Sequence, residues 1–177
     1  MKRVIDLIVS AVTIAGLYLV LLILAVAVRW KLGSPVLFRQ QRPGLNGRPF
    51  WLLKFRTMSE GCAQEAHQHF VRQMMTGDMR QPRDGVYKLD HDPRVTLVGR
   101  LLRRTSIDEL PQLVNVLRGE MSLVGPRPAL PWEVELFPVS VSGRFLVLPG
   151  LTGLWQVSGR NRLTMLEGLR LDVAYVS

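Results

Sequence analysis

Residues 4–28 read VIDLIVSAVTIAGLYLVLLILAVAV, a nearly unbroken apolar run that sets the architecture of the chain. Of these 25 residues, 21 are apolar. As one helix the run would be roughly 37 Å long, compared with a bilayer hydrocarbon core of about 30 Å. It ends in Arg29-Trp30-Lys31, which is typical of an interfacial anchor and not of a signal-peptide cleavage site. The sequence therefore predicts one long membrane helix.

The topology of this helix depends on its charged flanks. Lys2 and Arg3 precede it, and the flank that follows is more basic, so the C-terminal flank is expected in the cytoplasm. A single span would place the N-terminal flank outside, whereas a re-entrant hairpin would keep both flanks inside. A hairpin needs a helix break, for which Gly16 is the one candidate. Asp6 is costly in lipid unless it lies at the interface or pairs with a base.

The composition predicts one further domain after the membrane segment. The chain has 177 residues, of which 47% are hydrophobic, and this excludes an intrinsically disordered protein. Its one cysteine, Cys62, excludes an intramolecular disulfide framework and a zinc site built from cysteines. We expect residues 1–31 to form the membrane helix with its flanks, and residues 32–177 to form an interfacial domain in the cytoplasm.

The charge balance points to an anionic partner. The formal net charge is +9, and 19 of the 23 basic residues are arginines. Arginine binds phosphate and carboxylate oxygens with two parallel hydrogen bonds, which lysine cannot do. An acidic membrane surface and a phosphorylated small molecule both fit this composition. Nucleic acid is not expected, because no base-stacking motif occurs and a membrane segment is present.

The fold class is predicted as membrane-associated α+β. It should combine the membrane helix with a basic β-hairpin, interfacial amphipathic helices and Gly/Pro-rich loops around the site. Residues 34–40 and 48–55 favour the two strands of the hairpin, because dense turn formers separate them. Residues 60–76 favour a helix, and residues 77–92 favour an exposed loop.

Two helices are predicted in the middle of the chain. Asp92-Pro93 is a favourable start for the first, a basic amphipathic helix suited to anionic lipid headgroups. Its apolar stripe consists of Val95, Val98, Leu101 and Leu102. The second covers residues 107–118, where Ser106-x-x-Glu109 matches a capping box and Gly119 provides a stop.

Asp108 and Glu109 are the leading candidates for chemistry. Acidic residues in a first helical turn also complement the helix dipole, so a purely structural role is the alternative. These two carboxylates, however, follow Arg103 closely and lie near a predicted membrane surface. Carboxylates in such a place can bind Mg²⁺ shared with a phosphate, attack phosphorus, or accept a proton.

Two loops could bind phosphate. Gly125-Pro126-Arg127-Pro128 holds Arg127 between two prolines, which restrict the backbone and could preorganise a phosphate clamp. Residues 148–162 predict a glycine-rich loop, a strand and a second loop that carries Arg160. Backbone amides and arginine together form many anion sites, although this loop is not a P-loop.

Several of these stretches, taken in order, resemble the bacterial sugar transferases, also called monotopic phosphoglycosyl transferases. The similarity covers nearly the whole chain and begins with the apolar N-terminus. Its further motifs are Arg39-Gln40-Gln41-Arg42-Pro43-Gly44, Lys54-Phe55-Arg56-Thr57-Met58, Thr105 to Gln112, Gly119 to Pro128, and Pro149 to Asn161.

The resemblance implies a reaction. Members of the family transfer a sugar 1-phosphate from a UDP-sugar to a polyprenyl (undecaprenyl) phosphate at the bacterial inner membrane, releasing UMP and starting a surface glycan. Carried over by position, Asp108 is the nucleophile and a ligand of Mg²⁺, and Glu109 is its acid/base partner. The matching substrate-binding residues are Arg103, Arg127, Arg160, Lys54 and Arg56.

The chain departs from the family pattern at two positions. Tyr18-Leu19 stands where the family has a helix-breaking Ser-Pro pair, and Leu148 stands where a basic residue is usual. The chain also stops at Ser177, where many relatives continue into another helix. These departures motivate the alternative of a weakly active or inactive relative that binds lipid or a partner. The sugar, the polyprenol and the formation of a homodimer are not decided by the sequence.

Overall fold

The computed structural model describes residues 1–58, 96–159 and 163–176. The apolar N-terminus forms two helices, α1 (Lys2–Gly16) and α2 (Tyr18–Leu32), whose axes bend by 65° at Leu17. No single helix in the described part of the chain is long and apolar enough to cross a membrane, but this bent pair passes that test together. The prediction of one long helix is wrong. The bend lies beside Gly16, the predicted break point, as expected where glycine weakens a helix.

Helix α1 has its polar side chains turned toward the rest of the protein. Asp6 and Ser10 are its buried residues, the reverse of the pattern in a helix packed on a soluble core. Its exposed face is apolar and consists of Val4, Ile5, Ile8, Val9 and Val12. The helix is therefore amphipathic with the polar side inside.

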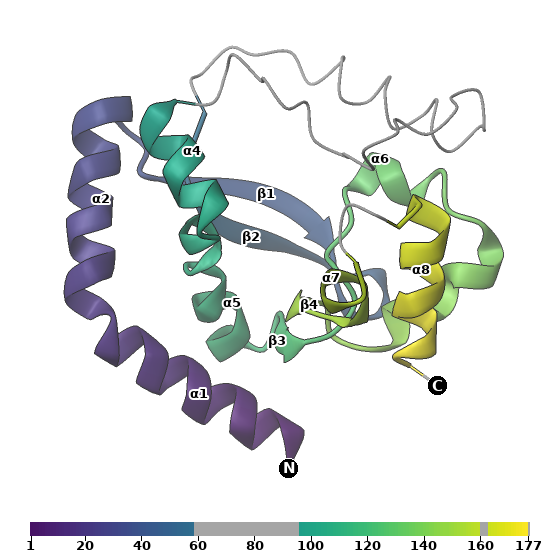
Figure 1. The fold of residues 1–177 in the computed structure, drawn as a ribbon. Coiled ribbons are helices and arrows are strands. Elements are labelled where there is room, and N and C mark those ends of the chain that lie inside the picture. Colours follow the sequence, from purple (N-terminus) through teal and green to yellow (C-terminus); the bar gives the residue numbers. More distant parts are fainter. Residues whose placement is uncertain (59–95, 160–162, 177) are drawn as a thin grey trace.

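Helix α2 packs through apolar side chains. Val28 is fully buried and forms a core cluster with Phe55 and Leu102. Figure 1 shows α2 standing beside α4 (Leu97–Arg104), the helix that supplies Leu102. The opposite side of α2 is exposed and equally apolar, with Leu19, Leu22, Ile23, Val26 and Trp30.

The basic hairpin is confirmed. Strands β1 (Leu37–Pro43) and β2 (Pro49–Phe55) pair antiparallel, with Leu37 opposite Phe55 and Pro43 opposite Pro49. The first strand begins three residues later than predicted. The connection contains the 3₁₀ turn η1 (Leu45–Gly47), where Asn46 and Gly47 both have positive φ, a conformation that these residue types tolerate.

Helix α5 (Gln112–Arg118) packs against β2 and fixes the second core cluster, formed by Phe50, Leu52, Val116 and Met121. The buried Asn115 joins the two elements. Its Oδ1 accepts from the backbone N–H of Leu53 at 3.1 Å, and its Nδ2 donates to the carbonyl of Trp51 at 2.8 Å. A buried amide satisfied in this way fixes the register between helix and strand.

The predicted helix over residues 107–118 is wrong in its first half. Ile107–Glu109 form a 3₁₀ turn, η2, and α5 begins only at Gln112. Ser106 adopts a left-handed conformation with φ of 57° and makes no side-chain cap, so the predicted capping box does not form. The predicted stop is confirmed, because Gly119 ends α5 with φ of 83°.

The basic helix α4 is present, but its start differs from the prediction. Asp92-Pro93 and Val95 lie outside the described residues, and α4 begins at Leu97 with Thr96 as N-cap. The Thr96 side chain accepts from the N–H of Gly99 at 3.0 Å. Of the predicted apolar stripe, Leu102 is buried and Leu101 is exposed.

The C-terminal half is built around a short parallel pair, β3 (Ser122–Val124) and β4 (Gly150–Thr152). The strand predicted within residues 148–162 is thus confirmed, but a helical turn, α7 (Leu154–Val157), follows it where a loop was predicted. A Cβ on Gly125, Gly150 or Gly153 would collide with backbone, so these glycines serve close packing. The surrounding elements are α6 (Pro131–Val134), η3 (Val139–Leu146) and α8 (Met165–Ala174).

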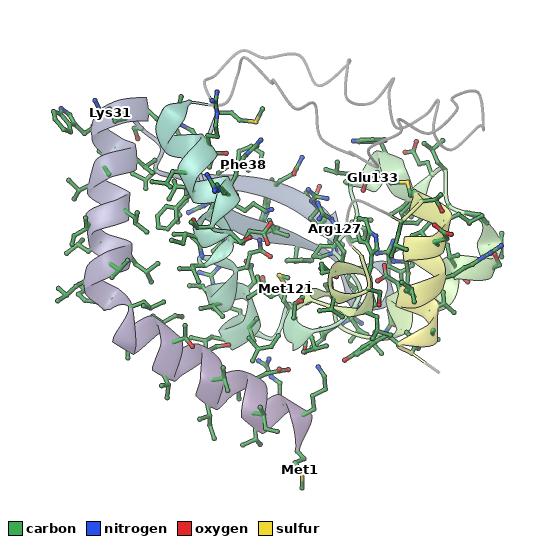
Figure 2. The ribbon with its side chains drawn as sticks, viewed as in Figure 1. Met1, Lys31, Phe38, Met121, Arg127 and Glu133 are labelled. Atoms are coloured by element: carbon green, nitrogen blue, oxygen red, sulfur yellow. The ribbon has the colours of Figure 1, made fainter. Side chains whose placement is uncertain are left out.

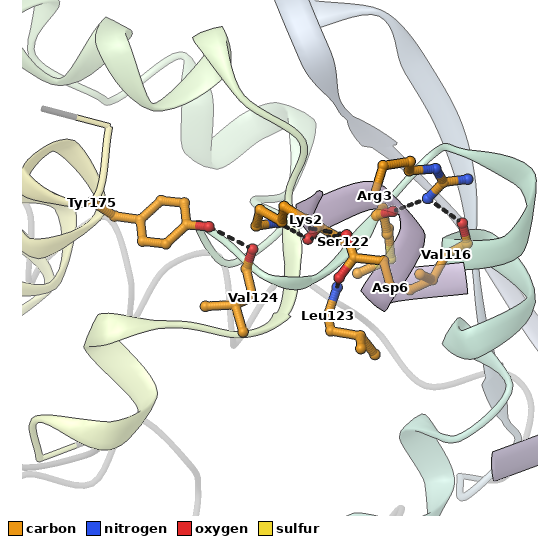
Figure 3. Close-up of polar contacts among 9 residues, drawn as sticks. Lys2, Arg3, Asp6, Val116, Ser122, Leu123, Val124 and Tyr175 are labelled. Carbon is orange, nitrogen blue, oxygen red and sulfur yellow. Dashed lines mark hydrogen bonds and ion pairs between the residues drawn. The ribbon is translucent and has the colours of Figure 1, made fainter. Parts of the chain in front are cut away.

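Polar contacts fasten α1 to this body (Figure 3). Asp6 accepts from the Ser122 hydroxyl at 2.8 Å and from the Leu123 N–H at 3.2 Å, and Lys2 contacts both Asp6 and Ser122. Arg3 donates to the carbonyls of Val116 and Leu117 at the end of α5, and to that of Met121 before β3. Asp6 therefore has the basic partner that the sequence analysis required.

Candidate active site

The turn before α5 presents the two predicted carboxylates. The left-handed Ser106 reverses the chain after α4, and the Glu109 N–H bonds back to the Ser106 carbonyl at 3.2 Å. Asp108 is 7% exposed, whereas Glu109 is half-buried. The two adjacent side chains thus leave the same short turn into different surroundings.

Lys54, on β2, lies against this turn. Its Nζ is 2.7 Å from the Glu109 Oε1, in a half-buried ion pair that links the hairpin to η2. Burial lowers the pKa of the Lys54 ammonium, while Glu109 and Asp108 act in the opposite direction. The structure therefore brings together three residues that the sequence had singled out separately.

The electrostatics of Asp108 differ from those of its neighbour. Burial is the main cause that raises the pKa of the Asp108 carboxyl, and the negative charge of Glu109 adds to it. Lys54 and Arg103 oppose this rise through their positive charges. Within residues 1–58, 96–159 and 163–176, no cation forms a direct ion pair with Asp108. Among the described residues, Asp108 is therefore not committed to a cation, unlike Glu109, which pairs with Lys54.

Arg103 reaches this region from the last turn of α4. Its Nε donates to the Thr57 hydroxyl at 3.0 Å, just beyond the end of β2. A Cβ on Gly99 would collide with the backbone carbonyl of Thr57, so glycine is required for α4 to lie this close. The guanidinium is thereby held near the carboxylate of Asp108.

Arg56 has a different environment. It is buried, and its Nη1 donates to the Ser34 carbonyl at 2.9 Å, in the link between α2 and β1. This contact fastens the end of the bent N-terminal helix pair to the hairpin. Its predicted contact with substrate stays a prediction.

Arg127 projects from the loop after β3. It is exposed, and its guanidinium lies 5.2 Å from the centre of the Trp155 ring. Its charge contributes to the lowered pKa of Lys54, which places the two cations in one electrostatic environment. Figure 2 shows Arg127 near the point where the hairpin meets the C-terminal half. Arg160, the remaining predicted site residue, lies outside the described residues.

Arg42 is a further candidate, to which its sequence context alone assigned no role. It donates to the Pro128 carbonyl at 3.0 Å and to the Gln40 side chain at 2.8 Å. Burial lowers its pKa to about 10. It therefore supports the loop of Arg127 from the hairpin side. The signal that could have found it is its place within the Arg39 to Gly44 motif.

The donor set fits Mg²⁺ held jointly with a substrate. Across the part of the chain that the structure describes, no group of three His, Cys, Asp or Glu side chains could hold a metal alone. Mg²⁺ in proteins commonly takes one or two carboxylates together with waters and substrate phosphates. Asp108 and the neighbouring Glu109 provide carboxylates of that kind.

Comparison with known proteins decides the family. A family model described as bacterial sugar transferase matches residues 1–177. The chain belongs to the bacterial sugar transferase family. The resemblance to this family that the sequence indicated is confirmed.

Three relatives within the bacterial sugar transferases illustrate the similarity. The galactosyl transferase CpsE of Streptococcus agalactiae is 45% identical over 82% of this chain and 31% of its own length. The exopolysaccharide production protein ExoY of Rhizobium meliloti is 41% identical over 99% of this chain and 76% of its own length. The UDP-glucose:undecaprenyl-phosphate glucose-1-phosphate transferase of Caulobacter vibrioides is 40% identical over 99% of this chain and 62% of its own length. The chain thus spans about a third of the first relative and about three quarters of the second.

Proposed function

We propose that this chain transfers a sugar 1-phosphate from a UDP-sugar to a polyprenyl phosphate and releases UMP. The observation that carries the proposal is the buried Asp108 carboxylate, which lies beside Glu109, Lys54 and Arg103 without a direct ion pair among the described residues. The name of the Caulobacter relative describes a reaction of this class for that protein. The product would be the first lipid-linked intermediate of a surface glycan.

In the first step, an Asp108 oxygen attacks the phosphorus that carries the sugar. A bond forms between that oxygen and phosphorus, and the bond from phosphorus to the bridging oxygen of the diphosphate breaks. UMP leaves with the bonding electron pair. The raised pKa of Asp108 is consistent with a carboxylate that is poorly solvated and therefore a better nucleophile than one in water.

In the second step, a phosphate oxygen of the polyprenyl phosphate attacks the same phosphorus. The Asp108–phosphorus bond breaks, and the carboxylate is restored. Glu109 is the adjacent group that can take the proton of the incoming phosphate and, in the first step, give one to UMP. Lys54 holds Glu109 at 2.7 Å and so fixes its orientation.

The substrates carry several negative charges that must be offset before a carboxylate can approach phosphorus. Arg103 and Lys54 supply positive charge around Asp108, Arg127 acts on the same region through its charge on Lys54, and Arg160 is proposed to join them. When bound, Mg²⁺ would neutralise the phosphate oxygens, with Asp108 as its protein ligand. These side chains would hold the donor diphosphate with its phosphorus facing Asp108.

We also propose that α1 and α2 enter the cytoplasmic leaflet of the inner membrane as a re-entrant pair. The apolar exposed faces of both helices support this, as does the 65° bend between them. Both outer ends of the pair contact the same body, through Asp6 at one end and Arg56 at the other. The acceptor lipid would then meet Asp108 at the interface.

The test of the reaction is UMP release by purified protein in detergent with Mg²⁺, undecaprenyl phosphate and a panel of UDP-sugars. A donor incubated without acceptor should release one UMP per protein and add the mass of a phospho-sugar to the chain. Asp108→Asn should abolish both signals, and Arg118→Gln on the exposed side of α5 serves as the matched control. Equal UMP release by wild type and Asp108→Asn would reject Asp108 as nucleophile. If the wild-type protein is folded and lipid-bound but releases no UMP with any donor, the alternative is favoured, in which the chain binds lipid or a partner without catalysis.

The re-entrant topology has a separate test. In a Cys62→Ser background, one cysteine is placed before Met1 and another at the exposed Arg48 of the hairpin turn. In oriented membrane vesicles, an impermeant thiol reagent should label both from the same side. Labelling from opposite sides would establish a single span.

A further inference from the structure

A buried ion pair lies in the C-terminal half of the molecule, outside the reaction steps described above. The Nη2 of Arg144, in η3, is 2.8 Å from the Oδ2 of Asp172, in α8. The two residues are 5% and 2% exposed. Removing two charges from water is costly, so a buried ion pair adds little net stability. Its presence therefore suggests a role other than stabilisation.

Both members of this pair bond the main chain of one residue, Arg127. The Nη2 of Arg144 donates to the Arg127 carbonyl, and the main chain of Arg127 lies close enough to the Asp172 carboxylate to lower its pKa. The paired side chains thus lie against the main chain of Arg127, and the contacts of Arg144 are charge-assisted. Pro126 and Pro128 restrict the backbone on either side of Arg127. The main chain of this residue is therefore fixed at both polar groups.

The exposed side chain of Arg127 is oriented by the same elements. Its guanidinium lies over the ring of Trp155, which itself packs against α8 at Gly168. A Cβ on Gly168 would lie 2.8 Å from that ring, so the helix carrying Asp172 also sets the position of Trp155. One helix thus supports both the main chain and the side chain of Arg127.

We infer that Arg144 and Asp172 are positioning residues that hold the Arg127 guanidinium in place for the diphosphate of the nucleotide-sugar donor. The inference rests on the proposed function. Neither residue is proposed to touch the donor, because both are buried and already paired with each other. Their contribution is preorganisation: a guanidinium already held in its binding conformation loses less entropy when it binds phosphate.

The first variant is Asp172→Asn, which keeps the shape and one acceptor but removes the charge. Immobilising one flexible side chain corresponds to about a 3- to 10-fold change in affinity. Asp172→Asn should therefore raise the donor KM by about 3- to 10-fold, with kcat close to that of wild type. Arg144→Lys keeps the charge, but its shorter side chain cannot place an ammonium where Nη2 contacts both Asp172 and the Arg127 carbonyl, so it should raise KM in the same direction. It also tests the inference should Asp172→Asn fold poorly.

A double-mutant cycle separates positioning from general damage. In an Arg127→Ala background, Asp172→Asn should leave the donor KM unchanged, because the side chain that it positions is gone. The matched control is Asp6→Asn, another buried aspartate that accepts a main-chain N–H, but from Leu123. Its effect should be the same with and without Arg127. An equal KM change for Asp172→Asn in both backgrounds would overturn the inference.

A second readout does not need activity. Trp155 emission is isolated as the difference between each protein and its Trp155→Phe counterpart. Asp172→Asn and Arg127→Ala should both make Trp155 more accessible to acrylamide, because the guanidinium would no longer cover the ring. Unchanged quenching in Asp172→Asn would overturn the inference even in a protein that turns over no donor. Absence of UMP release by wild type would instead count against the proposed function alone.

Discussion

Two buried aspartates, Asp108 and Asp172, show how differently this chain treats the same side chain. Both are almost inaccessible to solvent, and burial raises the pKa of both. Asp172 lies in the regular helix α8 and faces Arg144 at 2.8 Å. Asp108 lies in a turn after a left-handed Ser106, beside the like charge of Glu109.

The two carboxylates differ in whether a cation is paired with them directly. Asp172 forms a direct ion pair with Arg144 and lies close to the main chain of Arg127. Asp108 is influenced by Lys54 and Arg103 at longer range but has no direct ion pair among the described residues. Burial alone therefore does not distinguish a reactive carboxylate from a structural one, whereas the completeness of its hydrogen bonding does.

The largest expected effect comes from Asp108 itself. Replacement of this residue by asparagine should lower kcat/KM for UMP release by at least ~10³-fold, because a nucleophile cannot be replaced by a neutral amide. The melting temperature should change little, since no direct ion pair is lost. If Asp108→Asn lost much stability but kept its turnover, Asp108 would be a structural residue and not the nucleophile.

The next effect concerns stability and pH. The pKa of Asp172 is raised from 3.8 to about 6 in the folded protein, so folded chains bind more protons than unfolded ones between these values. Stability should therefore fall as pH rises through this window, by roughly 3 kcal/mol in total. Urea denaturation in detergent at about pH 4 and about pH 7 measures this change, with Asp172→Asn as the protein that lacks it. If the stability of wild type and Asp172→Asn changed equally between the two pH values, Asp172 would not be the group responsible.

A smaller effect tests the turn that carries Asp108. The left-handed backbone of Ser106 costs about 1 kcal/mol, whereas glycine adopts this conformation freely. Ser106→Gly should stabilise the protein by about 1 kcal/mol, and Ser106→Ala should be nearly neutral because no cap is lost. Thermal unfolding in detergent measures both variants. If the sequence-based capping box existed, both would be destabilised, the alanine variant by about 1 kcal/mol.

The smallest expected effect is a shift in the pH profile of kcat/KM. The acidic limb should lie above the usual range of an aspartate, because burial raises the pKa of Asp108. Lys54→Met removes a charge that lowers this pKa and should move the limb to higher pH. Glu109→Gln removes a charge that raises it and should move the limb to lower pH, even where kcat falls. Shifts of the same sign in both variants would exclude Asp108 as the group that titrates.

The sequence was informative where chemistry depends on residue identity. Asp108, Glu109, Lys54 and Arg103 were all predicted, and the structure brings them together from α4, β2 and η2. The local backbone was mispredicted, because Ser-x-x-Glu fits a capping box as well as it fits this turn. Pro111 was the overlooked signal, since proline is favoured at the start of a helix and α5 begins directly after it.

Other features had no local signature. Arg144 and Asp172 are far apart in sequence, and only the packing of α8 against η3 pairs them. The N-terminal run was recognised by hydropathy, which reports length and composition but not a bend of 65°. The polar face of α1 was visible as Asp6 and Ser10, but its partners in β3 were not.

The contacts of Arg3 carry a consequence for protein engineering. Its guanidinium caps the carbonyls of Val116 and Leu117 at the end of α5, the helix that continues from the Asp108 turn. Deleting the apolar helices to obtain a water-soluble enzyme would remove this cap together with the Asp6 anchor. Truncation of these helices would thus remove contacts that support the turn carrying the two carboxylates.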